Sequence, residues 1–244
     1  MCEYLLFRLY GSMASWGDIA VGEYRPSYDH PSKSAIIGLL SAAVGIRRDD
    51  DESLDKMVKH YAVAVKTIRS GVLLRDYHTV QVGRYKPFTR VVTRKQELEE
   101  ERAEKINTIL SSRDYYCDAI YVVCIWKLID SPLIPLTELK EKLLKPEFVC
   151  YLGRKSCPPS APFEPQIIEE SSIRSAFEAA QFRFSFPKEF CASKTYRVYW
   201  EGDRNEGFEG EKIHSTVHRD VPLSRRRWQF DERHEHLAVI EQEE

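Results

Sequence analysis

Residues that could bind an anion lie in three stretches of the sequence. The first, residues 151–156, reads Tyr-Leu-Gly-Arg-Lys-Ser. A glycine lets the backbone approach a ligand closely, and two adjacent cations followed by a hydroxyl suit phosphate oxygens. An ordinary Gly-Arg-Lys turn is the alternative. The binding candidates in this stretch are Tyr151, Gly153, Arg154, Lys155 and Ser156.

The second stretch is the entrance of a predicted helix. Pro31-Ser32-Lys33-Ser34 precedes a long apolar run that ends at Gly45, which predicts a helix with a serine at its N-cap. The unsatisfied N–H groups of a first helical turn attract anions, and Lys33 adds a positive charge. Ser32, Lys33 and Ser34 therefore form a second candidate site, with simple capping as the alternative.

The third stretch, residues 83–113, has the composition of an insertion that projects from the core. It holds eight Lys and Arg residues and few large apolar ones. Arg84, Tyr85 and Arg90 interleave charge with an aromatic ring, as contacts to unpaired bases and their phosphates require. Residues 94–110 are rich in helix formers. A solvated charged hairpin is the alternative for the whole stretch.

One further group, Arg75-Asp76-Tyr77-His78, raises the question of catalysis. A histidine with a nearby tyrosine and lysine could activate a 2′-hydroxyl for metal-independent RNA cleavage. Nothing in the sequence establishes a partner for His78, so a hydrogen-bonding strand histidine is the alternative. Motifs of nucleotide-binding loops, serine hydrolases and zinc proteases are absent, and no C-x-x-C pair occurs. We therefore expect no cofactor and no metal.

Length and composition fit one generous domain, or a domain with a small appendage. The chain has 244 residues, 43% of them hydrophobic, and a net charge of −2. This charge excludes a global basic field, so a nucleic-acid contact would have to be local. Residues 212–227 hold five cations against one acid, which suits either an anionic contact or a solvated surface.

The cellular location is also an expectation from composition. No apolar run approaches the ~20 residues that cross a bilayer, and the first residues lack the basic region and cleavage site of a signal peptide. We expect a cytoplasmic protein without a membrane partner, whose six scattered cysteines are buried and reduced.

The elements that must position these residues follow an α+β order. Apolar spacing predicts helices at 35–44, 53–59 and 135–144, and the proline-rich residues 158–170 read as a linker or long loop. A strand at 72–82 is expected to pair with the strand at 61–68. Strand–helix–strand, an insertion and again strand–helix–strand are compatible with a ferredoxin-like core. The other predicted strands are 4–10, 118–128, 182–186 and 196–200.

Several stretches, in the same order over about residues 4–160, together resemble the CasD family, the type I-E branch of the Cas-five proteins in the RAMP superfamily. They are residues 9–17, Arg25-Pro26, 34–50, 75–80, 116–119, 144–146 and 151–158. The resemblance implies an α+β, ferredoxin-like (RRM-like) RAMP domain at 1–160 with a protruding thumb at about 81–113. Residues 161–244 would then form an irregular C-terminal extension.

The resemblance also implies a function. Such a protein would be a subunit of a type I-E CRISPR Cascade complex in antiviral defence. It would bind the 5′ handle of the crRNA, cap the CasC backbone beside the large subunit CasA, and meet target DNA only through the complex. Because guide processing belongs to CasE, the resemblance implies a clamp and not an enzyme.

Under this expectation the candidate residues take particular roles. Lys33 with the helix entrance and Arg154, Lys155 and Ser156 would hold handle phosphates. Arg25, Arg75 and His78 would line the same face, and Arg84, Tyr85 and Arg90 would wedge the nucleotide at the handle–spacer boundary.

Two alternatives remain open at this point. One is a metal-independent endoribonuclease that processes repeat RNA, as type I-C relatives do, with Tyr28, His78 and Lys33 as its site. The other is a single-stranded RNA-binding module outside CRISPR.

Overall fold

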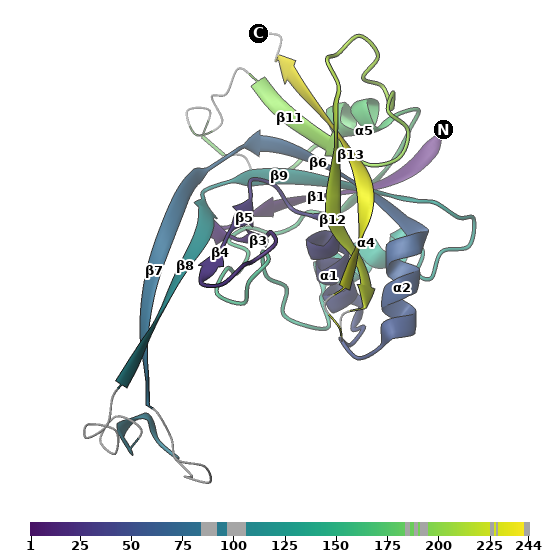
Figure 1. Cartoon of the computed structure of the whole chain (residues 1–244). Coiled ribbons are helices and arrows are strands. Elements are labelled where there is room, and N and C mark those ends of the chain that lie inside the picture. The colour runs from purple at the N-terminus through teal and green to yellow at the C-terminus, as the bar shows by residue number, and fades with distance from the viewer. Residues whose placement is uncertain are drawn as a thin grey trace.

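A seven-stranded antiparallel sheet forms the centre of the molecule, and a long two-stranded arm leaves it (Figure 1). The computed structural model describes residues 1–83, 92–96, 106–183, 186–187, 190, 195–224, 227 and 229–241. The strand order is β10-β1-β9-β6-β11-β13-β12. These strands are β1 (Cys2–Tyr10), β6 (Tyr61–Arg69), β9 (Ile120–Lys127), β10 (Gln166–Glu170), β11 (Thr195–Trp200), β12 (His214–Ser224) and β13 (Gln229–Glu241).

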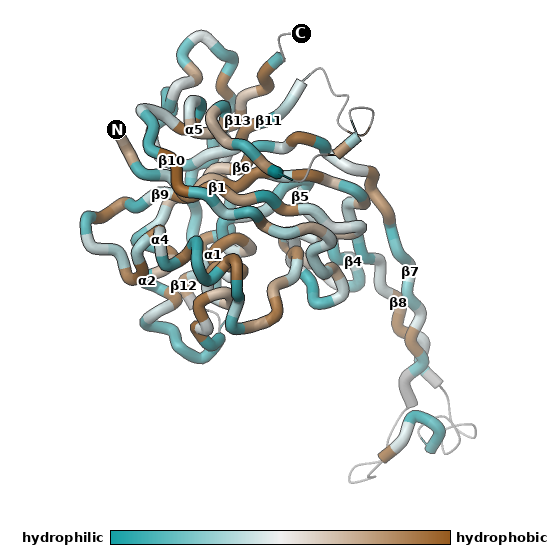
Figure 2. Tube along the Cα trace, turned by 180° about the vertical axis from the view of Figure 1, so that it is seen from behind, coloured by the Kyte–Doolittle hydropathy of each residue, from teal (hydrophilic) through white to brown (hydrophobic). Residues whose placement is uncertain are grey.

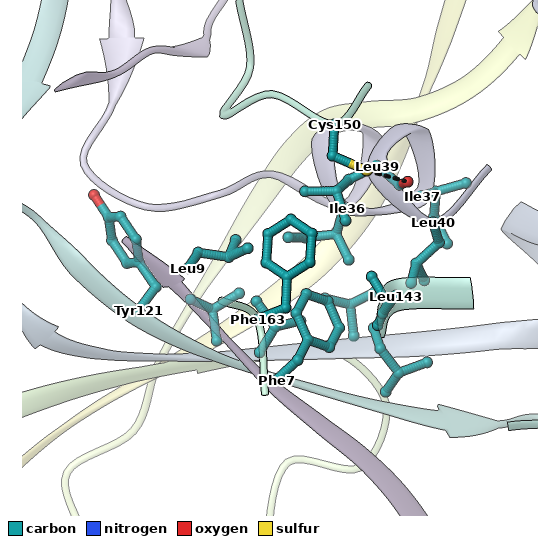
Figure 3. Packing of buried hydrophobic residues seen from close by; sticks show 14 of the residues in the cluster. Phe7, Leu9, Ile36, Ile37, Leu39, Leu40, Tyr121, Leu143, Cys150 and Phe163 are labelled. Atoms are coloured by element: carbon teal, nitrogen blue, oxygen red, sulfur yellow. Dashed lines mark hydrogen bonds between the residues drawn. The ribbon is translucent and has the colours of Figure 1, made fainter. Parts of the chain in front are cut away.

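The central strands are apolar on both faces because helices cover both faces of the sheet. On one face, Phe7 and Leu9 of β1 pack with residues of α1 and α4 and with Phe163 (Figure 3). On the other, Leu6 packs with Trp200 of β11 and with residues of α5. The helices are α1 (Lys33–Val44), α2 (Asp51–His60), α4 (Leu136–Leu144) and α5 (Ile173–Ala179).

The ends of α1 follow from its sequence. The Ser32 side chain caps the first turn by accepting a hydrogen bond from the N–H of Ala35 at 3.3 Å. Gly45 ends the helix in the left-handed conformation, at φ 84°, and its N–H bonds the carbonyl of Ala42 at 3.3 Å. The apolar body of the helix packs into the core, which fixes the segment before it against the sheet.

The arm is the hairpin of β7 (Val72–Gly83) and β8 (Ile106–Cys117), paired from Val72↔Cys117 to Gly83↔Ile106. Twelve residues at the usual rise extend about 40 Å. Near its root β8 also pairs with β2 (Met13–Ala14) and β4 (Tyr24–Arg25), while β3 (Trp16–Gly17) pairs with β5 (Ser27–Tyr28). Figure 2 shows hydrophobic stretches along both strands of the arm. Leu74, Tyr77 and Val80 of β7 and Ile109 of β8 have exposed side chains.

The structure confirms the three predicted helices and the strands expected at 4–10, 61–68, 118–128 and 196–200. The pairing expected for 72–82 is wrong, because β7 pairs with β8 and β6 lies between β9 and β11. The helical reading of 94–110 fails from Ile106 onward, where β8 begins. Ladder pairing with β7 outweighs the local helix preference there.

The C-terminal part is more regular than expected. The irregular extension predicted for 161–244 supplies four of the seven strands: β10 pairs with β1, and β11 pairs with β6. The predicted strand at 182–186 is wrong, since Phe182, Arg183 and Phe186 lie outside any strand. The predicted domain boundary at residue 160 therefore falls between strands of one sheet. No helix among the described residues is long and apolar enough to cross a membrane.

The cysteines follow the expectation only in part. Cys124, Cys150 and Cys157 are buried free thiols, whereas Cys2 is exposed and Cys117 is half-buried. Burial raises the pKa of the Cys150 thiol to about 11. Cys191 lies outside the described residues.

Candidate nucleic-acid interface

The register of the arm separates its side chains into two faces. Directly paired residues point to the same side of a ladder, and successive residues alternate. One side carries Arg25, Asp76, His78, Arg113 and Tyr115, since Arg113 pairs with both Arg25 and Asp76, and His78 pairs with Ser111. The opposite side carries Tyr24, Arg75, Tyr77 and Asp114. We name these the arginine face and the tyrosine face.

The arginine face brings together cations from three chain segments. Arg25 of β4 and Arg113 of β8 are register partners. Arg154 extends the set, because its guanidinium carbon lies 5.6 Å from the ring centroid of Tyr115, two residues beyond Arg113 on the same face. Among the described residues none of these three arginines pairs with a carboxylate, and the buried Nε of Arg113 has no hydrogen-bond partner. Asp76, the register partner of Arg113, also lies on this face, where its carboxylate bonds His78. The three arginines outnumber this acid, and the excess of positive charge attracts an anion.

The loop that carries Arg154 is held rigidly by its backbone. The Ser15 N–H donates to the Leu152 carbonyl at 3.1 Å, and the Cys157 N–H donates to the Arg154 carbonyl at 2.9 Å. Gly153 has φ 81°, and a Cβ there would lie 1.9 Å from the Ser15 carbonyl oxygen. The absence of a Cβ at Gly153 therefore permits this close approach to Ser15. In the same loop Tyr151, Lys155 and Ser156 are exposed.

The predicted anion site at the α1 entrance is wrong, because the protein's own carboxylates fill it. The Lys33 N–H donates to Asp220 Oδ2 at 2.8 Å, and the Lys33 ammonium lies 2.8 Å from Glu201 Oε1. Lys33 is only 5% exposed. The acids arrive from β12 and from the end of β11, which are remote in sequence, so the positive charge is neutralised inside the protein. The hydroxyls of Ser32 and Ser34 lie 3.1 Å apart at this entrance.

Arg75 belongs to the tyrosine face and is also neutralised, so the prediction that it lines one face with His78 is wrong. Its Nε donates to Asp114 Oδ1 at 2.8 Å, and its Nη2 donates to the Tyr24 hydroxyl at 2.6 Å. The hydrogen bond from Arg75 holds the pKa of the Asp114 carboxyl below its usual range. Arg75 and Asp114 tie β7 to β8, and Tyr24 ties both to β4.

The three residues considered for RNA cleavage do not form a site. The His78 ring bonds Asp76, the Tyr28 ring contacts His218 at 5.3 Å between centroids, and Lys33 bonds Glu201. No hydrogen bond, ion pair or ring contact joins two of the three.

Some candidates fall elsewhere, and others were missed. Arg84, Tyr85 and Arg90 lie outside the described residues. Sequence reasoning missed Arg113 and Tyr115 as members of the site. Their spacing of two on a strand is the signal that could identify them, but the helix-forming composition of residues 94–110 favours a helix directly before them.

Comparison with known proteins identifies the family. A family model described as CRISPR-associated protein (Cas_Cas5) matches residues 4–235. The CRISPR system Cascade subunit CasD of Escherichia coli (strain K12) is 35% identical over 171 residues, which cover 66% of this chain and 70% of that relative.

Two solved structures resemble the whole chain. One, described as a CRISPR RNA-guided surveillance complex, has a TM-score of 0.65 at 28% identity and covers 98% of this chain and 89% of that one. The other is described as a crystal structure of a Cas protein and shows the same fold, with a TM-score of 0.63 at 23% identity. The match covers 98% of this chain and 95% of the chain in that structure. The chain therefore belongs to the CasD/Cas5 family of CRISPR-associated proteins.

Proposed function

We propose that this protein is a non-catalytic subunit of a type I-E CRISPR Cascade complex and holds the 5′ handle of the crRNA on its arginine face. The observation that carries the proposal is the set Arg25, Arg113 and Arg154, which has no carboxylate partner among the described residues. The CasD relative and the similar surveillance-complex structure support the assignment to such a complex.

Guanidinium groups suit this task for a geometric reason. Their planar N–H donors match pairs of phosphate oxygens, and they stay charged at any physiological pH. Lys155 and Ser156 add exposed donors beside Arg154. Farther along the same face, Val80 pairs with Ile109, and both are exposed, so unpaired bases gain an apolar surface next to the charges.

The sheet supports a ferredoxin-like core within this proposal. The strand order β10-β1-β9-β6, with α1 after β1 and α4 after β9, corresponds to the β-α-β-β-α-β plan of that fold. In the complex this core would cap the CasC backbone beside CasA, with the arm as the thumb. The chain would meet target DNA only through these partners.

The test is the salt dependence of RNA binding by the full chain. Affinity for a handle oligonucleotide is measured at several salt concentrations for the wild type, Arg113→Ala and Arg154→Ala. Each variant should bind more weakly, and each lost phosphate contact should reduce the log–log salt slope by about 0.7. Arg219→Ala is the matched control, because Arg219 lies on β12 and pairs with Glu232 at 2.5 Å.

Unchanged affinity and slope in both variants would refute the binding face. Specific metal-independent cleavage of the repeat RNA, lost in His78→Ala, would instead refute the non-catalytic assignment and restore the endoribonuclease.

A further inference from the structure

His30 lies buried between two carboxylates, in the segment just before α1. Its Nδ1 is 2.7 Å from Asp29 Oδ1 and its Nε2 is 3.0 Å from Glu235 Oε1, and its side chain is 6% exposed. A carboxylate can only accept a hydrogen bond, so each ring nitrogen must donate one. Only the doubly protonated imidazolium has two N–H donors. The geometry therefore fits a positively charged His30 between two ionised carboxylates.

The two carboxylates connect His30 to different parts of the fold. Asp29 also accepts from Arg197 at 2.8 Å and from the Tyr199 hydroxyl at 3.2 Å, both on β11. Glu235 belongs to β13, where Arg233 also donates to it. His30 thus joins the entrance of α1 to the hairpin of β12 and β13.

A second chain of contacts runs in parallel to the first. Arg233 donates to Asp220 Oδ1 at 2.6 Å, and Asp220 accepts from the Lys33 N–H. Lys33 then pairs with Glu201, which accepts from the Val63 N–H at 2.8 Å. Two histidines of the network contact Glu235 Oε1: His30, and His218, whose Nε2 lies 3.2 Å from that oxygen. The ordinary pKa of a histidine lies near neutrality, so pH can remove a proton at this point of the network. Of the two, His30 is the one that holds a carboxylate at each ring nitrogen and so joins two segments.

The surroundings of His30 are apolar and aromatic as well as charged. The Tyr199 ring stacks on His30 with centroids 3.6 Å apart and an interplanar angle of 11°. The titratable and charged groups around it come from its own segment (Tyr28, Asp29), β9 (Tyr121), β11 (Arg197, Tyr199), β12 (His218) and β13 (Arg233, Glu235).

We propose that the proton on His30 is a pH-sensitive lock that fastens the β12–β13 hairpin to the entrance of α1. Figure 1 shows this hairpin crossing over the α1–α2 side of the molecule. When His30 loses its proton, one ring nitrogen becomes an acceptor that faces a carboxylate. The hydrogen bond at that nitrogen is then replaced by repulsion, and the hairpin loosens.

The sign of the pH dependence follows from the direction of the shift. Burial lowers the pKa of His30, but the hydrogen bonds with Asp29 and Glu235 outweigh burial and raise it above 6.5. The lock is thus fully present below 6.5 and is lost as pH rises through the raised value. Burial raises the pKa of Glu235, but His30, Arg233 and His218 lower it to about 2. Glu235 therefore stays ionised, and keeps its contact with His30, down to strongly acidic pH.

The experiment measures hydrogen exchange of the full chain at pH 6 and pH 9, corrected for intrinsic exchange rates. We expect protection of residues 214–224 and 229–237 to fall at least tenfold at pH 9, while β1 and β9 stay protected. In His30→Gln, protection of the hairpin should be low at both pH values. His234→Gln is the matched control, since His234 is exposed on the same hairpin and should behave as wild type.

A nitrogen NMR titration of wild-type His30 supplies a reading that does not depend on any variant. Both ring nitrogens should carry protons at pH 6.5, with a midpoint above that value. A neutral ring at pH 6.5, or a hairpin whose protection is the same at pH 6 and pH 9, would overturn the lock. So would a wild-type pH response in His30→Gln.

Discussion

Charge alone does not tell which basic residue can meet a ligand. Lys33 and Arg113 both lie in stretches that suit an anion, yet the structure gives them opposite environments. Glu201 and Asp220 reach the Lys33 backbone and side chain from the C-terminal strands. Arg113 forms no ion pair among the described residues, because Asp76, its register partner on β7, bonds His78. The difference is set by residues more than a hundred positions away, which no local pattern encodes.

Lys33→Met should therefore damage stability and leave RNA contacts intact. The substitution keeps much of the apolar stem but leaves Glu201 buried without its cation, which costs about 3–5 kcal/mol. Chemical denaturation measures this loss. Lys59→Met is the matched control, because Lys59 forms an exposed pair with Asp55 and should cost less than about 1 kcal/mol. A stable Lys33→Met variant with weakened RNA binding would contradict the structural role.

At the scale of elements, the hydrophobic pattern of a segment determines whether its helix or strand can be predicted from the sequence. The apolar runs of β1, β9 and α1 were recognised because both faces of these elements are buried. β7 is exposed along most of its length, and β8 is exposed at 107–109 and half-buried or buried from 110 onward, so packing leaves only a weak pattern in this hairpin. β12 and β13 were missed because their inward residues include Asp220 and Glu235, charges that only the buried network satisfies.

The candidate site was predictable to a similar extent. The sequence located Arg25, His78 and Arg154, which the structure places on the arginine face. The sequence could not show that Arg75 and His78 lie on opposite faces of the arm. The face of a strand residue is known only when the bounds of the strand and its pairing register are known.

Arg75→Ala should weaken RNA binding through the arm and not through a lost phosphate contact. Removing the guanidinium leaves Asp114, which is 3% exposed, with Tyr24 as its remaining side-chain partner, and loosens the join of β7, β8 and β4. We expect lower affinity, faster hydrogen exchange in β7 near Arg75, and an unchanged salt slope. Arg75→Lys keeps the positive charge, so its RNA affinity and its hydrogen exchange in β7 should lie between those of the wild type and those of Arg75→Ala. A reduced salt slope would instead make Arg75 a direct phosphate contact.

At the scale of the whole molecule, the two ends of the chain share one sheet. β10 and β11 add to β1 and β6 from outside, so the first 160 residues form the middle of the sheet and the last 84 form its edges. The second core, around Leu6 and Cys124, is closed by Trp200, Phe208 and Phe177 from the later part. The arm is formed by residues between β6 and β9, but the seven-stranded sheet to which it is attached contains strands from both ends of the chain.

A chain that ends at Ser160 should consequently fail to fold cooperatively, although the sequence suggests a domain of that length. It would lose four strands, expose Leu6 and Cys124, and leave Lys33 without Glu201. We expect a broad thermal transition and strong binding of a hydrophobic dye, because exposed apolar sheet surface cannot be compensated by the remaining helices. A chain that ends at Glu241 keeps β13 and is the control, with a sharp transition like that of the full chain. A sharp transition in the shorter chain would establish 1–160 as an independent domain, with the later strands as an addition to it.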